Sequence, residues 1–167
     1  MHKMTEENLK AAFAGESQAH MKYRIFSDVA SQENKPNLSR LFLAISDAER
    51  IHATNHFRVL NLVKESSSNI QTCIDGENYE IDEMYPAFND VAKLQKEAGA
   101  ERSTHTAWEA EKIHSALYQK AKQAIDAKKD VDAEDIFICQ VCGYTIEDSA
   151  PDKCPICGAP EEQFKKF

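Results

Sequence analysis

Apolar side chains recur every three or four positions over residues 1–130, which is the period of α-helices with one buried face. The first stripe comprises Leu9, Ala12, Phe13, Ala19, Tyr23 and Phe26. It predicts a helix that has Thr5 as its N-cap and ends near residues 31–36. Pro36 suits a first helical turn, so a second helix is predicted from there to about Lys64.

Two further helices complete the predicted helical region. The third should start at Ser66–Ser68, whose hydroxyls can cap a helix, and reach about Gly99. Pro86 should kink or interrupt it, because proline removes a backbone hydrogen bond. The fourth is predicted from about Ala100 to Lys129. Glycine and proline are otherwise sparse here, so the sequence predicts a mainly α protein built on four helices.

The composition changes after residue 133. Residues 136–167 hold four of the five cysteines, two of the five glycines and three of the five prolines. Such a stretch predicts a small module of short strands and turns. We therefore expect a helical domain over residues 1–133 and a β-ribbon module over 134–167.

Charge and hydropathy argue against several classes of protein. With 28 acidic against 20 basic residues, the formal net charge is −8, which argues against binding to nucleic acid or to an anionic membrane. No apolar run approaches the roughly 20 residues of a membrane span, and the first residues lack the apolar centre of a signal peptide. We expect a soluble, cytoplasmic protein whose cysteines bind metal rather than form disulfides.

The helical region contains a weak internal repeat. AGESQA resembles DGENYE, and their glutamates, Glu16 and Glu77, lie 61 positions apart. A Glu-x-x-His motif occurs twice, at Glu49 and at Glu111, 62 positions apart. Two copies of a helical hairpin, each carrying one glutamate and then one Glu-x-x-His motif, account for this pattern.

The repeated residues predict a metal site. In a helix, positions i and i+3 share a face, so each Glu-x-x-His can direct a carboxylate and an imidazole to one point. One Glu from each of two helices and a Glu-x-x-His from each of the other two is the known ligand pattern of ferritin-like di-iron proteins, and the sequence matches it. The expected ligands are Glu16, Glu49, His52, Glu77, Glu111 and His114. The alternative is a set of ordinary charged helix faces.

These ligands suit iron or manganese, because oxygen and imidazole donors dominate. Glu49 and Glu111 are expected to bridge two metals, while Glu16 and Glu77 each bind one. Buried carboxylates without cations would be too costly to coexist, so metal is expected wherever these side chains point inward.

Glu80 is a further candidate ligand without a counterpart in the first repeat, where Ala19 takes its place. Ferric iron favours carboxylate and ferrous iron accepts imidazole, so one iron could change between His52 and Glu80 with its redox state. Tyr23 and Tyr85 share helix faces with the ligands and are expected to bond to carboxylates or assist proton delivery. Simple core packing is the alternative for both tyrosines.

The C-terminal module carries two cysteine knuckles, CQVCGY and CPICGA, with 11 residues between Cys142 and Cys154. Together with Cys139 and Cys157 they can form a tetrahedral four-thiolate site. The knuckles resemble those of rubredoxin, which holds one iron, although the gap between them is shorter than in ordinary rubredoxins. A structural zinc site is the alternative.

AGESQAHMKY, ERIH, GENYEIDEMYP, EKIH and the two knuckles resemble the rubrerythrin family over nearly the whole chain. The resemblance implies a non-haem peroxidase that reduces hydrogen peroxide to water and protects against oxidative stress. It implies electrons from NAD(P)H by way of rubredoxin or a rubredoxin reductase, relayed through the four-cysteine iron. The exchange of Glu80 against His52 also matches the family pattern, and with Tyr23 and Tyr85 these are the expected catalytic residues.

Other functions remain open at this stage. One is ferroxidase activity or iron handling, although storage has no need of a thiolate-bound iron donor. Another is an electron carrier or redox sensor, which would leave the bundle ligands unexplained. Reduction of dioxygen is chemically close to reduction of peroxide and is harder to separate from it.

The connector between the second and third helices, about residues 65–67, is very short. A ferritin-like bundle needs this connector to run the length of the bundle, which three residues cannot span. We therefore expect a homodimer in which two helices of one chain complete a bundle with two helices of another. The alternatives are an up-down-up-down bundle within one chain and a longer unwound segment through SSSNIQTCIDG.

Overall fold

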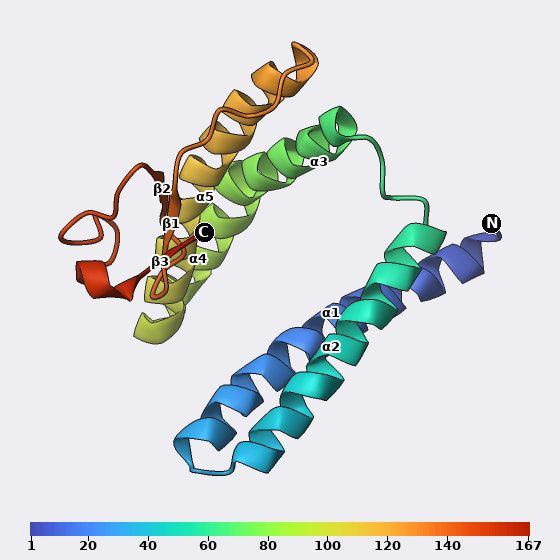
Figure 1. Ribbon diagram of the computed structural model, residues 1–167, viewed down its shortest axis with the longest axis horizontal. Coiled ribbons are helices and arrows are strands. Elements are labelled where there is room, and N and C mark those ends of the chain that lie inside the picture. Colours follow the sequence, from blue (N-terminus) through green and yellow to red (C-terminus); the bar gives the residue numbers. More distant parts are fainter. The chain divides into compact units, whose positions relative to one another are not determined.

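The computed structural model describes residues 1–167 and divides into two compact units, Met1–Lys64 and Glu65–Phe167 (Figure 1). This division falls inside the region that the sequence assigns to one helical domain, and the boundary expected at 133/134 stays a prediction. The helical region and the C-terminal sheet are both confirmed: the chain is mainly helical and ends in a small three-stranded sheet.

The first unit is a helical hairpin of α1 (Lys3–Gln32) and α2 (Pro36–Val59), which lie side by side. Helix α1 begins before the predicted cap at Thr5, because His2 takes the N-cap position and its carbonyl accepts a bond from the Glu6 amide. Asn34 adopts a left-handed conformation with φ 57° in the turn between the helices.

Small buried side chains hold this hairpin together. Ser27 donates its hydroxyl hydrogen bond to the Ser39 carbonyl at 2.9 Å. Further along, the Ser46 hydroxyl donates to the His20 carbonyl at 2.8 Å. The rings of Phe13 and Phe57 pack near the open end of the hairpin, with their centroids 5.0 Å apart.

The second unit begins with α3 (Ser66–Tyr79), a π-helical turn η1 (Glu80–Met84) and α4 (Tyr85–Gln95). The predicted interruption at Pro86 is confirmed, since the π-helical turn ends immediately before the first turn of α4. Gly99 does not end this helix. Lys96 takes the left-handed C-cap with φ 60°, and α5 (Ala98–Asp126) already includes the glycine.

The two hairpins repeat each other's internal contacts. Asn89 donates to the Glu101 carbonyl at 2.8 Å, as Ser27 does to Ser39. The Trp108 indole donates to the Ile81 carbonyl at 2.8 Å, as Ser46 does to the His20 carbonyl.

Comparison of these matched contacts shows where the second repeat has one residue more than the first. The offset between the repeats is still 61 at His20 and Ile81, but it is 62 at Tyr23 and Tyr85. Because each bond of a π-helical turn spans one residue more than an α-helical bond, η1 accommodates the extra residue without breaking the helix.

The chain ends in a sheet with strand order β2-β1-β3, formed by β1 (Ile136–Cys139), β2 (Thr145–Glu147) and β3 (Phe164–Lys166). Both pairings are antiparallel, with Ile138 opposite Thr145 and Cys139 opposite Phe164. A 3₁₀ turn, η2 (Glu161–Gln163), leads into the last strand. Beyond this short sheet, the module is held by the cysteine cluster and by contacts between β2 and α5.

Each hairpin leaves apolar side chains exposed at equivalent positions of the repeat. Phe26 and Val29 of α1 are close to half exposed, as are their counterparts Phe88 and Val91 of α4. These paired positions define one uncovered apolar face on each hairpin. None of the helices combines the length and the apolar composition that crossing a membrane requires.

The buried amide of Asn89 should be a main determinant of the stability of the second unit. It is 1% exposed and donates both to the Glu101 carbonyl and to the Thr104 hydroxyl. Asn89→Ala should lower the free energy of unfolding by roughly 1–3 kcal/mol, because it removes two buried hydrogen bonds between α4 and α5 and leaves a small cavity. Urea unfolding checks this, with the exposed neighbour Asp90→Ala as a control that should stay within about 0.5 kcal/mol of the parent.

Candidate metal centres

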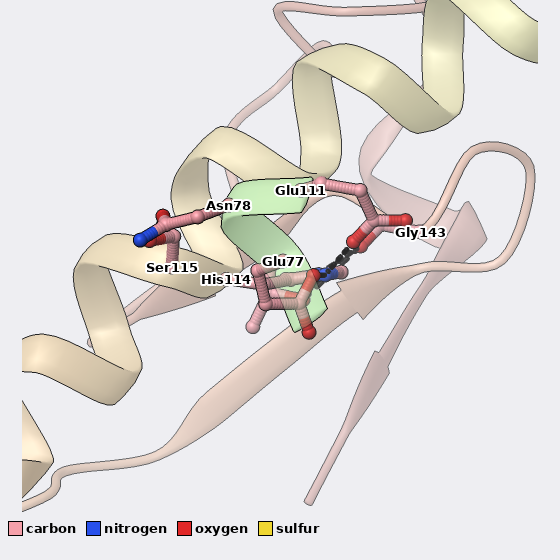
Figure 2. A network of polar contacts seen from close by, with 7 residues as sticks. Glu77, Asn78, Glu111, His114, Ser115 and Gly143 are labelled. Carbon is pink, nitrogen blue, oxygen red and sulfur yellow. Dashed lines mark hydrogen bonds and ion pairs between the residues drawn. The ribbon is translucent and has the colours of Figure 1, made fainter. Parts of the chain in front are cut away.

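Three predicted ligands meet in the second unit, where α3 lies against α5 (Figure 2). Glu77 comes from α3, and Glu111 and His114 come from one face of α5. One ligand atom of each lies within 4.8 Å of the others. The His114 Nδ1 atom is 2.6 Å from Glu111 Oε2 and 4.0 Å from Glu77 Oε2. Two carboxylates and one imidazole therefore converge on one point.

The electrostatics of this cluster fit a bound cation. Glu77 Oε2 is buried and has no hydrogen-bond partner. Burial, followed by the neighbouring Glu111, raises the pKa of Glu77 to about 8. Burial and then the charge of Glu111 also raise the pKa of Glu80. A cation would satisfy the orphaned oxygen and allow these carboxylates to be ionised together.

The first unit holds an equivalent cluster of Glu16 from α1 with Glu49 and His52 from α2, again within 4.8 Å of one another. His52 Nδ1 lies 2.9 Å from Glu49 Oε2 and 3.9 Å from Glu16 Oε1. The six residues predicted from the repeat are thus grouped as two matching half-sites, one in each compact unit.

The remaining sequence candidates lie around these half-sites. Glu80 is the first residue of η1, and its charge, after burial, contributes to the raised pKa of Tyr85. Tyr85 therefore lies within electrostatic reach of the second half-site. Tyr23 packs its ring against Phe26, with the centroids 6.4 Å apart, and its proposed polar role is a prediction.

Several supporting residues were missed by the sequence analysis. The Ser115 hydroxyl donates to Asn78 Oδ1 at 2.7 Å and so ties α5 to α3 beside the cluster (Figure 2). Burial, then Cys73, raises the pKa of Tyr118, one helical turn beyond His114. The spacing of four residues from His114 was a signal that could have found Tyr118, whereas the pairing of Ser115 with Asn78 depends on how the helices pack.

The second centre consists of the four cysteines of the ribbon. Their Sγ atoms lie within 4.8 Å of one another, with 3.7 Å between Cys139 and Cys157 and 3.5 Å between Cys142 and Cys154. All four are free thiols. Four converging sulfurs fit the tetrahedral thiolate coordination of a single iron or zinc.

A glycine closes each cysteine knuckle. Gly143 donates its amide to the Cys139 carbonyl at 2.9 Å, and Gly158 donates to the Cys154 carbonyl at 2.8 Å. Their φ angles of 82° and 75° belong to the left-handed region that glycine adopts without strain. The CxxCG pattern therefore places two thiols of each knuckle on one side of a tight turn.

Two helical hairpins with paired Glu and Glu-x-x-His ligands, followed by a four-thiol ribbon, define a class of iron oxidoreductases. The Rubrerythrin family model matches residues 7–122, and a model described as "Rubrerythrin, rubredoxin-like domain" matches 137–165. The chain belongs to the rubrerythrin family. The cofactors are accordingly a di-iron centre and a four-cysteine, rubredoxin-like iron centre.

The similarity extends over nearly the whole chain. Rubrerythrin-2 of Clostridium acetobutylicum is 42% identical over 98% of this chain and 97% of its own length. Nigerythrin of Nitratidesulfovibrio vulgaris is 33% identical over 98% of this chain and 86% of its own length. A solved structure of nigerythrin in its fully reduced, all-ferrous state has 32% identity and a TM-score of 0.58, with coverage of 98% of this chain and 86% of that chain.

The raised pKa of Glu77 predicts how the stability of the metal-free protein depends on pH. Its pKa is higher in the folded state, so its contribution is present below the ordinary value of 4.5 and is lost as the pH rises through about 8. The urea midpoint should therefore fall between pH 5 and pH 8, and Glu77→Gln should flatten this fall. The exposed Glu83→Gln should keep the parent slope, and equal slopes for all three proteins would contradict the assignment.

Proposed function

We propose that the chain reduces hydrogen peroxide to water at a di-iron site and receives electrons through its four-cysteine centre. The observation that carries the proposal is the pair of matching half-sites together with a four-thiol ribbon on the same chain. The proposed ligands are Glu16, Glu49, His52, Glu77, Glu80, Glu111 and His114 for the di-iron site and Cys139, Cys142, Cys154 and Cys157 for the single iron. A ferrous pair held by these residues would supply the two electrons that peroxide takes up, together with two protons, as it becomes two waters.

The surroundings of the two histidines support an exchange between His52 and Glu80. The His52 side chain is 55% exposed, and its contacts with Glu49 and Glu16 are made by its Nδ1 atom. His114 is 27% exposed, and two ribbon oxygens lie within hydrogen-bond distance of its Nε2. His114 therefore has contacts at both ring nitrogens, which favours His52 as the histidine that exchanges. Glu80 lies in a π-helical turn, the one place where the repeat gains a residue.

Tyr85 and Tyr23 are proposed to donate protons at the metal site. Burial and the charges of Glu80, Glu111 and Glu77 raise the pKa of Tyr85. Like any neutral phenol, its hydroxyl can donate a hydrogen bond to a nearby oxygen. Tyr23 is its counterpart in the first repeat. We assign the Tyr85 phenol oxygen as a proton donor beside the second half-site and Tyr23 as its equivalent beside the first.

The ribbon is proposed to accept electrons singly from a protein donor such as rubredoxin or an NAD(P)H-dependent rubredoxin reductase. A thiolate-bound iron suits this role because it changes its charge by one and keeps its four ligands. Four cysteines placed as metal ligands rather than in disulfides are typical of a reducing compartment, which supports a place in the cytoplasm. Ferroxidase or iron-handling activity makes no use of such a relay, and the reduction of dioxygen is the alternative that experiment must separate.

We also propose that each di-iron site is shared between two chains. The connector runs over residues 60–65, longer than the expected 65–67 because α2 ends at Val59. Six residues span at most about 20 Å. Helix α2, with 24 residues, is about 36 Å long, so the connector is too short for a ferritin-like crossover. Half-sites from two chains, joined through the uncovered apolar faces, would complete two bundles.

Peroxide should oxidise the fully reduced protein faster than dioxygen does, and Glu80 should contribute to that rate. Stopped-flow mixing of the reduced protein with each oxidant measures both rates. Glu80→Ala should slow the peroxide reaction on the order of 10-fold or more, because it removes a ligand of the oxidised state. Glu83→Ala, three residues further along, should behave like the parent. Equal rates with dioxygen and peroxide would favour a dioxygen-reducing protein.

Sharing of the site between chains predicts complementation. Glu16→Ala/Glu49→Ala disables the first half-site, and Glu77→Ala/Glu111→Ala disables the second. In a swapped dimer, refolding equal amounts of the two variants together should restore iron binding and peroxide turnover at about a quarter of the sites, because half of the dimers are mixed and each mixed dimer has one intact site. Sites made within one chain would give no restoration, and a monomer in sedimentation would also contradict the proposal.

A further inference from the structure

Two residues of the ribbon lie within hydrogen-bond distance of His114, a residue of the second half-site. The Nε2 atom of His114 lies 3.0 Å from Thr145 Oγ1 and 3.2 Å from the Gly143 carbonyl oxygen. The Thr145 hydroxyl in turn lies 3.1 Å from the same carbonyl and donates to it. Thr145 is 9% exposed, so this three-centre arrangement is shielded from water. These contacts connect Thr145, the first residue of β2, and Gly143, in the loop after Cys142, to His114 of α5.

The hydrogen positions in this arrangement follow from the chemistry of the groups. A carbonyl oxygen only accepts, and a hydroxyl that gives its single hydrogen to Gly143 has only lone pairs left for His114. In the metal-bound form Nδ1 would use its lone pair as the ligand, so a neutral His114 would carry its hydrogen on Nε2 and donate it to these oxygens. A neutral imidazole has one N–H, so Nδ1 keeps its lone pair. Nδ1 is the atom that faces Glu111 and Glu77, the proposed ligands of the same metal.

We propose that Thr145 is a positioning residue for the metal centre: with Gly143 it holds His114 so that Nδ1 faces the metal. The proposal rests on the proposed di-iron site and deepens it. An outer hydrogen bond to the second nitrogen of a ligating histidine fixes the ring and raises its basicity, which strengthens metal binding. In this chain the outer partner comes from the electron-accepting module, so the docked ribbon becomes part of the di-iron centre.

A second contact holds the ribbon in place independently of Thr145. Lys120 of α5 forms an ion pair with Glu147 at 2.5 Å. Thr145 and Glu147 are two residues apart in β2, so their side chains lie on the same face of the strand. This is the face that meets α5. Loss of the Thr145 hydroxyl should therefore loosen His114 while the ribbon stays docked.

The contact also makes the two half-sites unequal. His52 occupies the same place in the first repeat and contacts Glu49 through Nδ1, whereas His114 contacts Glu111 through Nδ1 and has two candidate acceptors at Nε2. The inserted residue near Glu80 and the ribbon at His114 both belong to the second repeat. The ribbon thus restrains His114, the histidine that is not proposed to exchange.

Thr145→Val tests the proposal, because it keeps the shape of the side chain and removes the hydroxyl. Anaerobic equilibrium dialysis of the full-length protein against ferrous iron, with the ribbon iron already in place, measures the affinity of the bundle. Thr145→Val should weaken this affinity on the order of 10-fold or more. Thr145→Ser should restore most of it. Thr145→Ala is a second deletion of the hydroxyl and should show the same loss if the valine variant folds poorly.

Lys120→Met is the matched control, since it breaks the other ribbon contact and leaves His114 untouched. It should bind ferrous iron within about threefold of the parent, a change too small for the loss of an outer hydrogen bond. Unchanged affinity in Thr145→Val and Thr145→Ala, or equal weakening in Lys120→Met, would overturn the role of Thr145. The titration contains no peroxide, so failure of peroxide turnover would count against the proposed function and not against this result. A parent that binds only the ribbon iron would overturn both.

Discussion

The repulsion among closely packed carboxylates is the constraint on which this structure depends. Glu77, Glu111 and Glu80 share a partly buried space in which the pKa values of Glu77 and Glu80 are raised, and Glu77 Oε2 has no partner. Such a group is stable only when it takes up protons or binds cations. Burial of acidic side chains is therefore evidence of function in this chain, because the same helices would pack more stably around apolar residues.

The internal repeat accounts for the features that the two half-sites share. The differences between the repeats account for the features that make the half-sites unequal. Both hairpins place a Glu and a Glu-x-x-His at equivalent positions and hold them with equivalent buried hydrogen bonds. Only the second contains the π-helical turn with Glu80, and only the second contacts the ribbon through His114. Glu80 in the place of Ala19 adds a candidate ligand to the second repeat, and the contact with β2 changes how firmly His114 is held.

Features that depend on local spacing were predictable from the sequence, and features that depend on packing were not. The Glu-x-x-His motifs, the cysteine knuckles and the interruption near Pro86 follow from short-range geometry, and the structure contains each of them. The end of the third helix was mispredicted at Gly99, because Lys96 accepts a left-handed conformation that glycine would ordinarily supply. The contact between His114 and Thr145 joins residues 31 positions apart, and no periodicity in the chain points to it.

The offset between the repeats was nevertheless a signal for the π-helical turn. The offset between matching residues of the two repeats changes from 61 to 62, so the second repeat must contain one residue without a counterpart. A helix can accommodate such a residue either in a π-helical turn or at a break. The turn begins at Glu80, whose counterpart at the offset of 61 is Ala19, so the unmatched residue lies among residues 82–84 of the same turn. The inserted residue therefore rotates the following helix back into register, so that Tyr85 and Asn89 match Tyr23 and Ser27, whereas the additional carboxylate comes from Glu80 in the place of Ala19. One insertion and one substitution thus make the two half-sites unequal, while both hairpins keep equivalent buried hydrogen bonds.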